Sequence, residues 1–296
     1  MKSSFYLMAA CSAILMGTIG IIARLGDLDA ATLTFYRLAL GALILMLFLQ
    51  FKGQGKRLLT RPHWGTVLGG MLLAGFILCF LKAIETIPMS LAIMLVYLAP
   101  AVAAIGAHFL FDERLTKASL ALVLLAFFGF AMLQEFSFDT RGAEAVGLGY
   151  ALACLGAYSA FILINKQVPA SADPFAKTWV QLSVGALCCI PLIWQLPLPK
   201  GNDWLWLAMA ALFPGFLAIL FAVKAITALP AKVFGTLAYL EPLVVVLAGF
   251  WLFNEPMSAL KWAGCGLILL SGIAQAQLTR KPHSNHAGKA GHHGVS

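Results

Sequence analysis

Hydrophobic positions along this chain fall into long, mostly apolar runs that are separated by short polar segments. Ten such runs can be counted, at about residues 4–23, 32–51, 64–83, 89–110, 117–134, 146–165, 175–194, 204–224, 232–252 and 260–278. A helix needs roughly 20 apolar residues to cross the hydrocarbon core of a bilayer. Because lipid offers no partners to backbone polar groups, these runs should be helices rather than strands. The pattern predicts an all-α integral membrane protein with ten transmembrane helices.

One segment of the chain occurs twice. Twelve of the 32 residues from Lys82 to Glu113 recur unchanged between Lys224 and Glu255, which lie 142 positions later. This offset maps the third to fifth apolar runs onto the eighth to tenth. The chain is therefore expected to be an internal duplication.

The number of helices per half sets the relative orientation of the halves. Five is an odd number, so the second half should enter the membrane upside down relative to the first. The predicted units are a first repeat over residues 4–134, a second over 146–278, and a disordered polar tail over 280–296. Inverted repeats of this kind place a binding site near the midplane and allow rocking between two open states.

Composition excludes an ordinary soluble domain. The chain is 61% hydrophobic and 11% charged, whereas soluble domains are about 45–50% apolar and about 25% charged. All six cysteines fall inside predicted spans, so neither a disulfide framework nor a metal site is implied. No phosphate loop, catalytic triad or paired carboxylates are visible in the sequence. No cofactor is predicted, and an ATP-driven pump is disfavoured.

The net charge of +8 is informative by position. With a cytoplasmic N-terminus, 14 of the 20 Lys and Arg residues fall inside, 5 fall outside, and Arg37 lies within a span. This asymmetry satisfies the positive-inside rule and predicts two cytoplasmic termini in a bacterial inner membrane. The basic excess therefore reflects topology, and nothing indicates a nucleic-acid partner.

Short motifs recur in the same order in both halves. They are TFYRL at 34–38, LAP at 98–100 with FDERL at 111–115, and LEP at 240–242 with FNEPM at 253–257. Their order, spacing and duplication resemble the EamA-type domains of the drug/metabolite transporter superfamily, over about residues 4–278. The resemblance implies a ten-helix inner-membrane carrier, often an exporter of amino acids and related metabolites. It does not name a substrate.

The chain departs from this family pattern at two pairs of positions. Asp112 and Asn254 stand where the family often has a glycine before the glutamate at the end of the span. Lys82 and Lys224 stand where an aromatic or small residue is common.

Two charged residues lie well inside predicted spans, where insertion costs about 2.5–3.5 kcal/mol each. Arg37 could bind a substrate carboxylate through its bidentate fork, or it could be a structural arginine that snorkels outward or caps carbonyls. Glu241 directly precedes Pro242. It could carry a coupling proton or pair with a substrate amine, or it could satisfy backbone groups that the proline frees. Both interpretations stay open for each residue.

Lys82 and Lys224 are equivalent positions in the two repeats. In inverted repeats one would face the outer vestibule and the other the inner vestibule, and together they could attract a substrate carboxylate or phosphate. The alternative is snorkelling, because a lysine stem can reach the headgroups from the end of a span.

Aromatic and proline residues complete the candidate site. Tyr97 and Tyr239 are equivalent mid-span positions, and with Tyr158 they could line a cavity or bond to a neighbouring carbonyl. Pro100 and Pro242 are expected to kink their helices, and a kink beside a midplane site suits a gating helix.

These patterns predict a secondary transporter that works by alternating access. Basic groups outnumber acidic ones in the spans, which favours export of a small zwitterionic or anionic metabolite, such as an amino acid or its derivative. The alternative is an importer of a vitamin-like or other small metabolite. An integral-membrane enzyme or a channel is disfavoured. The expected partners are the small-molecule substrate, the lipid bilayer and, if Glu241 titrates, a proton gradient.

Reporter fusions test the predicted topology. Fusions in the Lys52–His63 loop and the 280–296 tail should report a cytoplasmic location, and a fusion in the Glu135–Ala145 loop should report the opposite side, because Lys and Arg concentrate inside. An extracellular C-terminus would contradict both the ten-span count and the inverted repeat.

Overall fold

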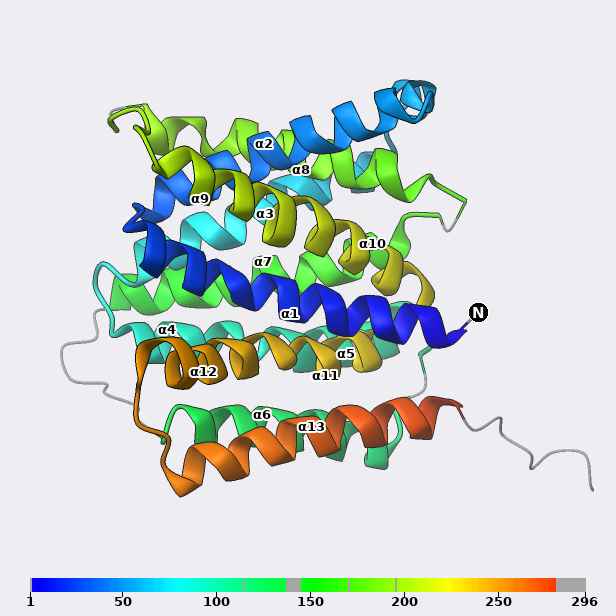
Figure 1. Ribbon diagram of the computed structural model, residues 1–296. Helices are drawn as coiled ribbons and strands as arrows, with labels where there is room; N and C mark the ends of the chain where they lie inside the picture. Colours follow the sequence, from blue (N-terminus) through cyan, green and yellow to red (C-terminus); the bar gives the residue numbers. More distant parts are fainter. Residues whose placement is uncertain (1, 114, 137–144, 170, 195, 281–296) are drawn as a thin grey trace, which may run out of the picture.

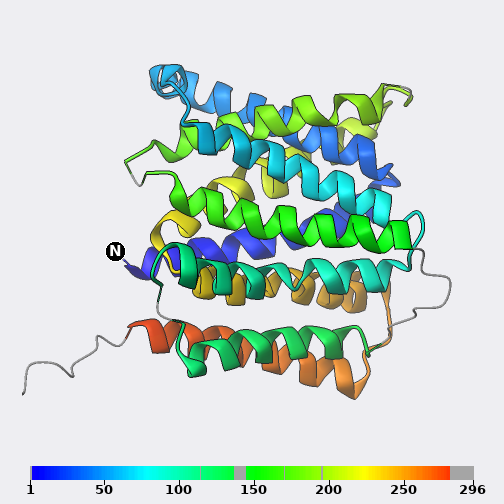
Figure 2. The same ribbon diagram turned by 180° about the vertical axis from the view of Figure 1, so that it is seen from behind.

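The computed structural model describes residues 2–113, 115–136, 145–169, 171–194 and 196–280. These residues form a bundle of helices that run side by side, with no strand among them (Figure 1, Figure 2). The predicted all-α class is therefore confirmed for the described part of the chain. The predicted disordered tail from residue 281 onward and the 137–144 segment between the halves lie outside the described residues.

The helices follow one another in the order of the predicted runs. They are α1 (Lys2–Gly26), α2 (Ala30–Phe51), α3 (Trp64–Ala83), α4 (Met89–Val96), α5 (Ala99–Leu110), α6 (Lys117–Leu133), α7 (Ala145–Gln167), α8 (Pro174–Ile193), α9 (Asp203–Ala210), α10 (Ala218–Ala228), α11 (Ala231–Ala238), α12 (Leu240–Phe253) and α13 (Ala259–Arg280), with a short 3₁₀ helix η1 (Gly55–Leu59) and a π-helix η2 (Ala211–Leu217).

The architecture is that of a multi-pass membrane protein. Within the described ranges, nine segments are long and apolar enough to cross a bilayer, whereas α6 has 17 residues. At about 1.5 Å per residue α6 is roughly 25 Å long, less than the roughly 30 Å hydrocarbon core. The start of α1 and the end of α13 lie at the same end of the bundle (Figure 1), so the chain passes through it an even number of times. The ten-span count and the inverted relation of the halves stay predictions.

Two predicted spans are interrupted near their middle. The fourth run forms α4 and α5, and the ninth forms α11 and α12. Pro100 and Pro242 stand in the first turns of α5 and α12. A proline has no N–H to donate, so the carbonyls of Val96 and Ala238, four residues earlier, lose their helical partners. Each helix ends at that freed carbonyl. The residues between the paired helices, Tyr97 and Leu98 in one span and Tyr239 in the other, keep right-handed backbone angles, so each span is interrupted only briefly.

The backbone conformation explains why Asp112 and Asn254 can replace the glycine that is common in the family. Asp112 and Asn254 adopt left-handed backbone angles, with φ of 51° and 53°. Asp and Asn are among the few non-glycine residues that tolerate this conformation at a helix end. The amide of the next residue then donates to a carbonyl six residues earlier, at 3.4 Å for Glu113 and 3.0 Å for Glu255. Both glutamates are therefore held at equivalent places.

Close backbone contact joins α6 to α13. A Cβ atom on Gly264 would lie 2.6 Å from the carbonyl oxygen of Gly129, which no real side chain tolerates. Gly266, two residues further along the same helix, has nothing within 4 Å of its Cβ position. Small residues permit such helix approach in lipid. Gly264 is therefore a packing residue, and Gly266 is not.

This difference predicts unequal effects of the same substitution. Gly264→Val should separate α6 from α13 and lower the unfolding free energy by about 1–3 kcal/mol, a typical cost of overpacking. Gly266→Val is the matched control and should have little effect. Thermal unfolding of the detergent-purified proteins would measure both. Equal melting temperatures for the two variants would contradict the close approach.

Candidate functional site

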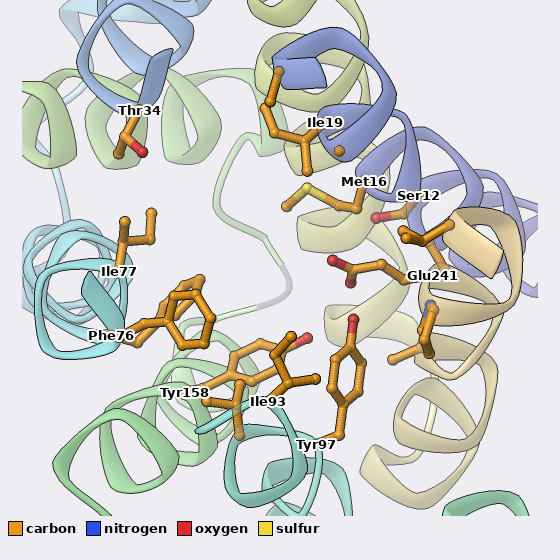
Figure 3. A pocket seen from close by; sticks show the side chains of 18 of the residues that line it. Ser12, Met16, Ile19, Thr34, Phe76, Ile77, Ile93, Tyr97, Tyr158 and Glu241 are labelled. Carbon is orange, nitrogen blue, oxygen red and sulfur yellow. The ribbon is translucent and has the colours of Figure 1, made fainter. Parts of the chain in front are cut away.

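A cavity of about 500 Å³ lies inside the bundle at the level of the helix breaks. Most of its lining is apolar, and its polar lining residues are Ser12, Thr34, Arg37, Tyr97, Gln134, Tyr158 and Glu241 (Figure 3). The lining reaches Ala23 at the end of α1, Leu81 at the end of α3 and Leu133 at the end of α6. The cavity therefore extends from the middle of the bundle to the end where these helices finish.

Arg37 lies in this lining with its side chain almost fully buried. Helix α2 begins at the Asp29 N-cap, whose carboxylate accepts hydrogen bonds from the amides of Ala31 at 2.9 Å and Thr32 at 3.0 Å. The π-helix η2 presses against its backbone, since a Cβ atom on Gly215 would lie 2.6 Å from the Arg37 carbonyl oxygen. Only glycine permits that approach. Two elements of different halves thus fix the position of Arg37.

The guanidinium of Arg37 carries an unused donor. Arg37 is 7% exposed, and its Nε atom is buried without a hydrogen-bond partner. An unpaired buried donor on a charged group is costly. The Nε atom itself is closed off from open space, whereas other atoms of Arg37 line the cavity.

Glu241 enters the same cavity from the second half. It lies in the first turn of α12, directly after the helix break. Its carboxylate projects into the open space between Met16 and Tyr97 (Figure 3). A helix N-terminus carries partial positive charge and stabilises an anion there. The ion pairs of the described residues do not include Arg37 with Glu241, so one cavity presents two separate opposite charges.

Two tyrosines stand beside Glu241. The Tyr97 and Tyr158 hydroxyl groups both point toward its carboxylate (Figure 3). Tyr97 is held against Phe130, with ring centroids 4.6 Å apart, and Tyr158 stacks on Phe76 at 5.1 Å. These apolar contacts hold the rings, and the Tyr97 hydroxyl has a hydrogen bond with the Glu241 side chain. Both tyrosines line the cavity.

The two lysines that depart from the family pattern do not line this cavity. Lys82 pairs with Glu85 at 2.8 Å, one turn later in the chain, and its side chain is half exposed. The Lys224 ammonium lies 4.6 Å from the centroid of the Phe175 ring. In this conformation the structure brings neither lysine to the candidate site.

Equivalent residues of the two repeats also differ in position. Tyr239 is fully buried, and its hydroxyl donates a 2.6 Å hydrogen bond to the carbonyl oxygen of Tyr97. Pro242 lines the cavity, whereas Pro100 packs against α11, where a Cβ atom on Gly235 would lie 2.8 Å from it. One member of each pair therefore faces open space and the other is enclosed.

The lining includes polar residues that the sequence did not single out. Thr34 precedes Arg37 by three residues, which places both on one face of α2. The three-residue spacing between Thr34 and Arg37 is the sequence signal that could have identified Thr34. Ser12 lies on α1 and donates a 2.8 Å hydrogen bond to the Ala218 carbonyl oxygen. Ser12 ties α1 to α10 beside the cavity.

A buried polar cluster also lies outside the cavity. Lys177 is only 3% exposed, and its ammonium donates to the Thr227 hydroxyl at 3.1 Å. Gln181 donates to the Asn165 side-chain oxygen at 2.7 Å. This cluster joins α7, α8 and α10. The sequence did not predict this cluster, because its residues come from helices that are distant in the chain.

Comparison with known proteins places the chain in a family. The model of the EamA-like transporter family matches residues 3–134 and again 146–274. A solved crystal structure of a protein superposes with a TM-score of 0.84 at 21% sequence identity, over 95% of this chain and 100% of that one, which shows a shared fold.

Curated relatives cover most of the chain. The threonine/homoserine exporter RhtA of Salmonella typhimurium (strain LT2) is 27% identical over 262 residues, which are 86% of this chain and 84% of the relative. The pseudopaline exporter CntI of Pseudomonas aeruginosa is 29% identical over 255 residues, 83% and 86% of the two chains. With both repeats matched by the family model, the chain belongs to the EamA-like transporters of the drug/metabolite transporter superfamily and is a membrane-embedded carrier of a small-molecule substrate.

Proposed function

We propose that this transporter exports a zwitterionic amino acid or amino-acid derivative by alternating access. The observation that carries the proposal is one cavity lined by two opposite charges, Arg37 and Glu241, that do not form an ion pair with each other. A zwitterion with neighbouring ammonium and carboxylate groups complements both charges at once.

The arrangement suggests a binding mode. The substrate carboxylate would accept hydrogen bonds from the Arg37 guanidinium, whose fork matches carboxylate geometry. The substrate ammonium would donate to Glu241, and the Tyr97 and Tyr158 hydroxyls would complete its polar surroundings. Each ionic group would then have a partner of opposite charge in a region where unpaired charge is expensive.

The apolar part of the cavity lining indicates which substrate side chains would fit. Phe76, Phe80, Phe130, Phe161 and Phe234 all line the cavity, together with aliphatic residues. A side chain placed among them would leave water for an apolar surface, which favours transfer of apolar groups. We therefore expect apolar or aromatic amino acids to be better substrates than small polar ones.

The relatives support export as the direction. RhtA is named as an exporter of threonine and homoserine, and CntI as an exporter of pseudopaline. The protein would export its substrate across an inner membrane, and both of its termini would be cytoplasmic. The two five-helix repeats, residues 4–134 and 146–278, would be inverted relative to each other and would rock about the helix breaks near Pro100 and Pro242.

Coupling to a proton gradient is proposed for Glu241. A carboxylate that projects into a mostly apolar cavity can exchange a proton with whichever side of the membrane the cavity faces. The substrate ammonium and the proton would compete for the same carboxylate. Such competition couples outward movement of one to inward movement of the other.

Replacement of Arg37 tests the carboxylate contact. Arg37→Lys keeps the charge but loses the fork, and efflux of a labelled aromatic amino acid from preloaded cells should fall by roughly tenfold or more. Arg57→Lys, at a partly exposed arginine that pairs with Asp173 at 3.4 Å, is the matched control and should leave efflux unchanged.

Substrate analogues complete this test. Amidated or esterified amino acids should compete poorly for efflux, because they lack the carboxylate that Arg37 receives. Equal competition by the amide would contradict the binding mode. If overexpressing cells instead concentrate the labelled solute from the medium, the protein is an importer and the proposed direction is wrong.

Replacement of Glu241 by glutamine tests the coupling. Glutamine keeps hydrogen-bonding capacity but cannot titrate. Glu241→Gln should abolish the response of transport to an imposed pH gradient in proteoliposomes, while exchange of labelled for unlabelled substrate survives. A variant that folds and still follows the pH gradient would show that Glu241 does not carry the coupling proton. Glu85→Gln, at an exposed carboxylate, is the control.

A further inference from the structure

Two ion pairs in the structure are related by the internal repeat. Arg24 pairs with Glu255, and Lys166 pairs with Glu113. Lys166 follows Arg24 by 142 positions, and Glu255 follows Glu113 by the same number. Each pair joins one half of the chain to the other. The same charged contact is therefore made twice, once at each end of the bundle.

The surroundings of the two pairs differ. The side chains of Lys166 and Glu113 are each 15% exposed, whereas those of Arg24 and Glu255 are 54% and 49% exposed. The first pair is closed off by protein. The second stands in the open, at the end of the bundle to which the cavity extends.

The buried pair also holds the turn before α11. The Lys166 ammonium donates a 2.9 Å hydrogen bond to the Leu229 carbonyl oxygen. The Glu113 carboxylate accepts a 2.9 Å hydrogen bond from the Ala231 amide. Because Pro230 between them has no N–H, these are the backbone groups that the turn offers. The ion pair and the turn thus form a closed latch.

The equivalent turn before α4 is not held in this way. Its corresponding residues are Ile87 and Met89, 142 positions before Leu229 and Ala231. Met89 is 55% exposed and lines the cavity, whereas Ala231 is 1% exposed. Among the described hydrogen bonds, those of Arg24 and Glu255 join the two side chains to each other and do not reach the backbone of this turn. The second latch has its ion pair but has not engaged its turn.

The same asymmetry occurs at the helix breaks. The Tyr239 hydroxyl donates to the Tyr97 carbonyl oxygen, and these residues are 142 positions apart. Tyr239 is buried, while the Tyr97 hydroxyl points into the cavity (Figure 3). The contact is again made in one direction only.

We propose that the two ion pairs are alternating latches whose backbone contacts exchange when the transporter changes its open side. In the opposite state Glu255 accepts from the Met89 amide and Arg24 donates to the Ile87 carbonyl, while Lys166 and Glu113 release the turn before α11. At the breaks, the Tyr97 hydroxyl then donates to the Tyr239 carbonyl. This inference rests on the alternating access in the proposed function.

The exchange has a physical rationale. Each state keeps one latch engaged and one released, so the number of hydrogen bonds and buried charges changes little between the states. A carrier needs two states of similar free energy, because a ligand shifts an equilibrium only by its differential affinity for them. Equivalent latches at the two ends supply this balance.

Cysteine accessibility tests the exchange without any substrate. Met89→Cys and Ala231→Cys are introduced separately into a variant in which the six native cysteines are replaced. A membrane-impermeant maleimide is applied to right-side-out and inside-out vesicles. Glu113→Gln should raise labelling at position 231 and lower it at position 89, and Glu255→Gln should do the reverse. Each ratio should change by roughly tenfold or more, since losing one partner of a charge pair costs more than such a shift requires.

Glu85→Gln is the matched control, because its ion pair with Lys82 lies within one half. It should leave both labelling rates unchanged. Lys166→Met should act like Glu113→Gln and replaces it if that variant is not recovered in the membrane. Opposite shifts for Glu113→Gln and Glu255→Gln support the latches, even if amino-acid export fails. Shifts in the same direction, or none in a protein that exports amino acids, overturn the latches and leave the proposed substrate intact.

Discussion

The constraint on which this structure depends is that backbone polar groups cannot be left unpaired in lipid. It makes the apolar runs helical and confines irregular backbone to the protein interior. Pro100 and Pro242 each remove a helical donor, and the residues with the freed carbonyls, Val96 and Ala238, both line the cavity. The breaks therefore occur where open space between the helices can receive those polar groups. The cavity and the breaks are two aspects of one arrangement.

The same constraint explains where charge is kept. Arg37 and Glu241 stand within spans, where an unpaired charge is expensive, yet they are not paired with each other. Arg37 is fixed by the close approach of Gly215 from the second half, and Glu241 by the start of α12. Both side chains are held before any substrate arrives, so binding needs little reordering. Preorganised polar groups of this kind give a site its affinity and specificity.

The two ends of the bundle carry equivalent segments of the duplicated sequence in different surroundings. Asp112 and Asn254 end their helices in the same left-handed conformation and deliver Glu113 and Glu255 to equivalent places. Local structure at these two helix ends is therefore the same in both repeats. The difference is in packing between the halves, which encloses Ala231 and leaves its equivalent Met89 exposed.

The sequence by itself determined the features that depend on local chemistry. Run length and the absence of partners in lipid gave the helical membrane class, and the repeat gave the equivalent positions. Proline chemistry predicted disturbance at Pro100 and Pro242, where each span is interrupted over one or two residues. Tyr97, Tyr158, Arg37 and Glu241 could be selected because polar groups inside apolar runs require a reason.

Only the tertiary structure decided which member of each equivalent pair faces the cavity. Tyr97 and Tyr239 carry the same local signals, yet one lines the open space and the other is enclosed. Lys82 and Lys224 were equally plausible from their spacing, and neither reaches the site. Burial of Lys177 likewise arises from α7 and α10, which are remote in the chain from its own turn. Exposure in a duplicated fold depends on how the halves pack in a given state, and a signal that both members of a pair share cannot encode that difference.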